Sequence, residues 1–79
     1  MASKPSDKSW EDRVRLFLKA EIKRADISYE ELATRLKDHG INESAASLAN
    51  KLARGTFAAT WFLACLAALE LDGIRLEDI

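Results

Sequence analysis

The sequence has little of what several protein classes require. Its 79 residues include one cysteine, one histidine, one proline and three glycines. A single cysteine cannot form an intrachain disulfide, and one histidine with one cysteine cannot complete a closed zinc site. There is also no glycine-rich phosphate loop. We therefore expect no catalytic residue, no metal site and no cofactor, and a protein that is not an enzyme.

A long apolar segment and a strong charge of one sign are also missing. The longest uncharged run, Gly55–Leu69, is shorter than the ~20 apolar residues that cross a bilayer, and no secretory signal opens the chain. We therefore expect a cytoplasmic protein without a membrane segment. The net charge is −1 at pH 7, so any binding to nucleic acid has to come from a local patch of basic residues.

The composition is typical of one folded domain, with 48% hydrophobic and 32% charged residues. Residues 1–8 are polar and contain the proline, which indicates a flexible N-terminal arm. Residues 9–79 are expected to form a single helical domain. Because so short a chain buries a limited core, the length also favours oligomerisation.

Two helices are predicted in the first half of the chain. Apolar residues recur at helical spacing over 10–24, with Ser9 as the N-cap. Ser28 and Glu31 form a capping box for a second helix that ends near residue 39. Gly40 is predicted to be the left-handed residue that ends it, after which a connection of two to four residues leads to Asn42 as the next N-cap.

A third helix is predicted over 43–54. Its apolar residues turn inward, and it leaves a polar stripe at i, i+3, i+4 and i+7 that consists of Ser47, Asn50, Lys51 and Arg54. Gly55 is expected to stop this helix, and Thr56 to cap the one that follows.

A fourth helix is predicted over 57–71, where only Thr60 and Glu70 are not apolar. The side with Leu63 is expected to face the core. The opposite side needs a cover, because a helix that is apolar all round must be buried all round. Either the first helix supplies that cover, or a second copy of the chain packs against this side as a homodimer. The residues of that side assigned to the dimer interface are Phe57, Trp61, Ala64 and Ala68.

The segment 74–79 is expected to form a short final turn whose three apolar residues close the core. No strand is predicted, because alternation at period two is absent. The fold class is therefore all-α, a compact bundle of four to five short helices.

Part of the chain resembles a known DNA-binding fold. From Ile27 to Ile79 it is similar to the lambda-repressor-like (Cro/C1-type) helix-turn-helix domain, in residues 28–33 for the first motif helix, 48–55 for the end of the recognition helix and 63–79 for the closing helices. From Val14 onward it also looks like a bacterial family of unknown function built around Arg54-Gly55-Thr56-Phe57, which implies no established activity.

The resemblance implies a small transcriptional regulator that binds duplex DNA as a homodimer, with the helix over 43–54 in the major groove. Small or short polar side chains at Ser44, Ser47 and Asn50 would let that helix approach the bases. Asn50 would pair with adenine and Arg54 with guanine. Phosphate contacts are assigned to the basic residues Lys51, Lys19 and Lys23.

A second hypothesis uses the same fold without nucleic acid. The near-neutral charge and the extreme apolarity of the predicted fourth helix favour a module for self-association or for docking a protein partner. Loss of DNA affinity with added salt separates the two hypotheses.

Overall fold

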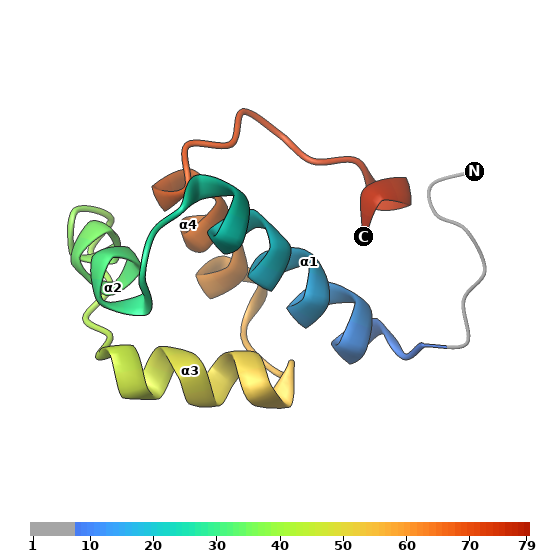
Figure 1. The fold of residues 1–79 in the computed structure, drawn as a ribbon, viewed down its shortest axis with the longest axis horizontal. Helices are drawn as coiled ribbons and strands as arrows, with labels where there is room; N and C mark the ends of the chain where they lie inside the picture. The colour runs from blue at the N-terminus through green and yellow to red at the C-terminus, as the bar shows by residue number, and fades with distance from the viewer. Residues whose placement is uncertain (1–7) are drawn as a thin grey trace.

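The computed structural model describes residues 8–79, and residues 1–7 of the predicted N-terminal arm lie outside that range. It contains four α-helices and a 3₁₀ turn (Figure 1). Their bounds are α1 Trp10–Ala25, α2 Tyr29–Lys37, α3 Ala45–Arg54, α4 Ala59–Ala68 and η1 Leu76–Asp78. No strand occurs in the described part of the chain, so the predicted all-α class is confirmed.

Serine side chains begin the first three helices. Ser9 and Ser28 each accept a hydrogen bond from the backbone N–H three residues on, as predicted. The prediction of Asn42 as the third cap is wrong, because Ser44 takes this role and accepts from the N–H of Ser47. The helix α3 therefore begins two residues later than expected. Thr56 does not cap α4, whose N-cap position is Ala58 and has no side-chain hydrogen bond.

Glycines with positive φ end α2 and α3. Gly40 has φ +79° and follows α2, where the Ile41 N–H donates to the Leu36 carbonyl at 3.0 Å and the Gly40 N–H donates to Lys37 at 3.0 Å. These two bonds form a Schellman motif, so the predicted role of Gly40 is confirmed. The connection to α3 is longer than predicted and spans 38–44, because α2 ends at Lys37.

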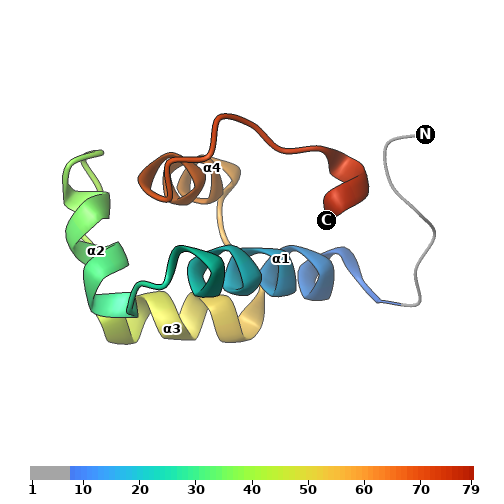
Figure 2. The ribbon, with the colours of Figure 1, turned by 45° about the horizontal axis from the view of Figure 1, so that its top comes forward.

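The helices share one core, in which α2 contacts both α3 and α4, and α3 also contacts α1. Figures 1 and 2 show α3 beside α1 and antiparallel to it, α4 on another side of α1, and α2 crossing one end of the assembly. The segment after α4 returns along α1 on the side away from α3. The side chains that are buried completely include Leu18, Leu32, Leu36, Leu48, Leu52 and Cys65.

The orientation of α4 agrees with the prediction only in part, because Leu66 and Leu69 on the side expected inside are buried, while other residues are not where they were expected. Trp61 and Ala68, assigned to an exposed dimer interface, are 5% and 4% exposed and belong to the core of a single chain. Leu63, expected inside, is 58% exposed. Phe57 and Ala64 are partly buried against the core. A helix that is apolar on every side carries no periodic signal to fix which side turns inward, so the sequence could not orient it.

The last residues cover α1 only in part. Ile74 packs against the core, but Leu76 is half exposed, so the expectation that all three apolar residues of 74–79 close the core is wrong for Leu76. The guanidinium of Arg13 holds the end of this segment by donating two hydrogen bonds, of 3.2 and 2.9 Å, to the Ile79 carbonyl oxygen.

Candidate nucleic-acid interface

One side of α3 is open to solvent. Leu48 and Leu52 anchor the helix in the core, and the opposite side exposes small or polar residues and one cation. The exposed residues of α3 are Ala46, Asn50, Ala53 and Arg54. The N-cap Ser44 is exposed beside them, and α3 contains no acidic residue.

Two residues predicted for this face are engaged inside the protein. The Ser47 hydroxyl donates to one carboxylate oxygen of Glu43, and Lys51 Nζ lies 3.0 Å from the other. Both side chains are partly buried. The structure thus separates the predicted set: Asn50 and Arg54 face outward, and Ser47 and Lys51 turn toward Glu43.

Glu43 is the acceptor of a partly buried polar cluster. Its side chain is 6% exposed, and besides Ser47 and Lys51 it accepts a hydrogen bond of 3.1 Å from Trp61 Nε1 on α4. Lys51 Nζ also lies 5.0 Å from the centroid of the Trp61 ring, a cation–π contact. The cluster therefore fastens both ends of α3 to α4.

The charge state of Glu43 follows from these partners. Burial raises the pKa of a carboxyl, but the hydrogen bonds from Ser47, Lys51 and Trp61 and the charge of Lys51 hold the pKa of Glu43 below its ordinary value of 4.5. The sequence prediction did not include this residue. The spacing of Glu43, Ser47 and Lys51 on one side of a helix was a usable signal, but the contact with Trp61 was not visible in the sequence.

The neighbouring helix α1 carries two exposed lysines. Lys19 and Lys23 are exposed on α1, and within residues 8–79 neither makes an ion pair. Phe17 packs edge-on against Phe62 of α4, with ring centroids 6.5 Å apart. Lys19 lies 200° around the helix from Phe17 and hence points away from α4. The basic side of α1 is thus turned away from the layer formed by α4.

Gly55 joins this region to the start of α1. Its φ is +71°, and a Cβ built on it would lie 2.5 Å from the Glu11 carbonyl oxygen. Only glycine fits both the backbone conformation and this close approach. The turn thereby fixes the position of Arg54, which immediately precedes it.

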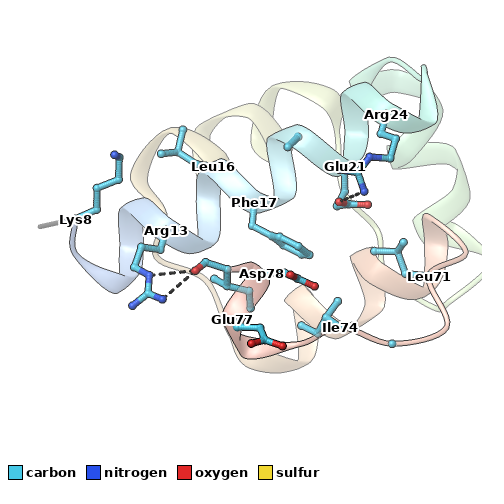
Figure 3. A pocket seen from close by; sticks show the side chains of 13 residues that line it. Lys8, Arg13, Leu16, Phe17, Glu21, Arg24, Leu71, Ile74, Glu77 and Asp78 are labelled. Atoms are coloured by element: carbon cyan, nitrogen blue, oxygen red, sulfur yellow. Dashed lines mark hydrogen bonds and ion pairs between the residues drawn. The ribbon is translucent and has the colours of Figure 1, made fainter. Parts of the chain in front are cut away.

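A separate groove lies between α1 and the segment 71–79. It has a volume of about 830 Å³, and the side chain of Phe17 points into it (Figure 3). Acidic and basic residues both line it, including Arg13 at one end and the Glu21–Arg24 ion pair of 2.8 Å at the other. This groove lies across α1 from α3, and charges of both signs line it. It is therefore not part of the interface built on α3.

Cys65 is the one cysteine among the described residues, and it is buried. Burial raises the pKa of the Cys65 thiol to about 12, so this group is not a nucleophile near neutral pH. Within 8–79 no group of three or more His, Cys, Asp or Glu residues is arranged to hold a metal ion. A helix long and apolar enough to cross a membrane is likewise missing from this part of the chain.

Sequence comparison places the domain in one family. The profile of a domain of unknown function, DUF6471, matches residues 10–74, which include all four α-helices. No curated protein and no solved structure matches the chain significantly.

Proposed function

The chain belongs to the DUF6471 family of domains of unknown function, and we propose that it binds duplex DNA as a small helix-turn-helix regulator through the exposed side of α3. The observation that carries this proposal is the surface of α3, which is small and polar and free of acidic residues. A surface of this kind meets little repulsion from phosphate.

In this proposal α3 enters the major groove. The groove is about 12 Å wide and admits one helix. Ala46 and Ala53 would let the backbone come close to the base edges, because neither side chain extends far. Asn50 would then pair with adenine and Arg54 with guanine, each through two hydrogen bonds.

The arrangement of α2 and α3 supports a helix-turn-helix interpretation. Both helices are short, they contact each other, and the glycine turn at Gly40 redirects the chain between them. The connection over 38–44 is longer than the turn of three or four residues that is usual for this motif. The exposed surface of α3 therefore supports DNA binding more strongly than the turn over 38–44 does.

Phosphate contacts in this proposal come from α1. Lys19 and Lys23 are exposed on the side turned away from α4. Because few cations are available in each chain, useful affinity needs a homodimer, which doubles the phosphate contacts. The exposed Leu63 on α4 is the residue we assign to that dimer contact, in place of Trp61 and Ala68.

Fluorescence anisotropy with a labelled random-sequence duplex tests this proposal. We expect micromolar binding at about 50 mM salt and at least a tenfold loss of affinity at about 200 mM, since several phosphate contacts displace counterions. Arg54→Ala should weaken binding at least fivefold. The matched control Arg75→Ala removes the same charge from an exposed residue of the C-terminal segment and should stay within twofold of wild type. Absence of binding at the lower salt would refute the proposal.

The second candidate function is a module for protein interaction. The exposed Leu63 on α4 and the apolar residues in the lining of the groove favour it. This candidate predicts a dimer or a heterologous complex that forms without DNA and whose stability changes little between the two salt concentrations. The same anisotropy series therefore separates the two functions.

A further inference from the structure

Lys51 lies beside the proposed base-contacting residue Arg54 but is held by a different part of the protein. The two residues are three positions apart and are neighbours on the surface of α3. Lys51 Nζ is 3.0 Å from Glu43 and packs over the Trp61 ring, while about a third of the side chain remains exposed. Its charge is therefore close to the interface, although its ammonium group is bound elsewhere.

The surroundings of the Glu43 carboxylate strengthen its ion pair with the Lys51 ammonium group. The side chain of Glu43 is covered more completely than that of a surface acid, so water screens its attraction for the partly exposed Lys51 less. Ser47 and Trp61 fix the carboxylate in position through their own hydrogen bonds. The negative charge of Glu43 and the positive charge of Lys51 cancel, so the pair presents no net charge to an approaching duplex.

We propose that Glu43 limits the electrostatic affinity of α3 for duplex DNA by holding Lys51 in an internal ion pair. This inference rests on the proposed function. In the free protein and in the complex, Lys51 then remains paired with Glu43. Arg54 is the cation of α3 that contacts DNA. Weaker contact with phosphate increases the share of the binding free energy that depends on base contacts, so Glu43 favours discrimination between sequences.

The variant Glu43→Gln tests this inference, because it removes the negative charge and nearly keeps the shape of the side chain. Release of Lys51 to a phosphate should raise the affinity for a random-sequence duplex on the order of fivefold at about 0.1 M salt. It should also steepen the slope of log K against log salt by about 0.9 for each bound copy. A purely structural role for Glu43 predicts the opposite, since a loosened α3 would bind DNA more weakly.

Two controls isolate the ion pair. Glu77→Gln makes the same change of net charge on η1, across α1 from α3, and should leave the affinity within twofold of wild type. The double variant Glu43→Gln/Lys51→Gln removes both partners and should return the affinity and the slope to the wild-type values. A gain that persists in the double variant would overturn the inference.

If circular dichroism shows that Glu43→Gln does not fold, the variant Lys51→Gln tests the inference instead. Lys51→Gln keeps a donor for Glu43 and should leave the salt slope unchanged, whereas Lys19→Gln should reduce it by about 0.9 per copy. An equal reduction by both lysine variants would show that Lys51 already contacts phosphate and would overturn the inference. If wild type binds and the Glu43→Gln affinity does not rise, the inference alone fails. Binding by neither protein overturns the proposed function as well.

Discussion

Gly55 is the residue whose identity the backbone restricts most strongly. Its φ of +71° lies in the left-handed region, and the Glu11 carbonyl oxygen occupies the space of a Cβ. Gly40 has a similar φ of +79°, but a Cβ at that residue would meet nothing within 4 Å. The two glycines therefore differ in one respect, which is that the backbone of α1 lies close to Gly55 and not to Gly40.

We expect Gly55→Ala to lower the free energy of unfolding by about 3 kcal/mol or more, since the strain of a left-handed alanine adds to the clash with Glu11. Gly40→Ala should cost about 1 kcal/mol, from the backbone conformation alone. Urea denaturation followed by circular dichroism measures both values. Equal losses at the two positions would contradict the proposed contact between the α3 turn and α1.

Glu43 gives the protein a defined response to acid. Its pKa in the folded chain is below the ordinary value of 4.5, so the ionised carboxylate stabilises the fold. This stabilisation is complete above the pKa of the unfolded chain and is lost as the pH falls through the lower pKa of the folded chain.

The difference in unfolding free energy between wild type and Glu43→Gln should consequently be constant near neutral pH and shrink below about pH 4.5. Urea denaturation at a series of pH values measures this difference. Glu30→Gln makes the same substitution at an exposed position on α2 and serves as the control. A difference between wild type and Glu43→Gln that does not change with pH would show that hydrogen bonding, rather than charge, is what Glu43 contributes.

At the scale of elements, α3 and α4 show when a sequence can predict an orientation. The apolar residues of α3 gather on one side, so the buried pair Leu48 and Leu52 and the exposed Asn50 were predictable. α4 is apolar on nearly every side, and its inward face is set by packing against α1 and α2. That is why Trp61 was placed on the wrong side and Leu63 was placed inside.

The exposed side of α4 carries a prediction about assembly. Leu63 is 58% exposed, so Leu63→Glu should leave the free energy of unfolding within about 1 kcal/mol of wild type. If α4 forms the homodimer contact, light scattering should show the mass of this variant falling to that of a single chain. Leu76→Glu makes the same change at a half-exposed residue of η1 and should not alter the mass. A dimeric Leu63→Glu variant would place the interface elsewhere.

At the scale of the whole molecule, local signals predicted the elements but not the contacts between them. Serine caps and glycine stops defined the start of α1 and α2 and the end of α3 to within a few residues. The link from Glu43 to Trp61 joins residues far apart in the sequence and depends on how α3 and α4 are placed. The sequence therefore identified Asn50 and Arg54 correctly as exposed and could not show that Lys51 is paired with Glu43.

We propose that the surface that meets duplex DNA consists of α3 and the exposed lysines of α1. Titration of ¹⁵N-labelled protein with a duplex, followed in ¹H–¹⁵N correlation spectra, tests this claim directly. We predict that the largest shifts gather at residues 44–54, with smaller ones around Lys19 and Lys23, and that residues 71–79 of the groove stay unchanged. Shifts confined to the groove, or no shifts at low salt, would contradict the claim.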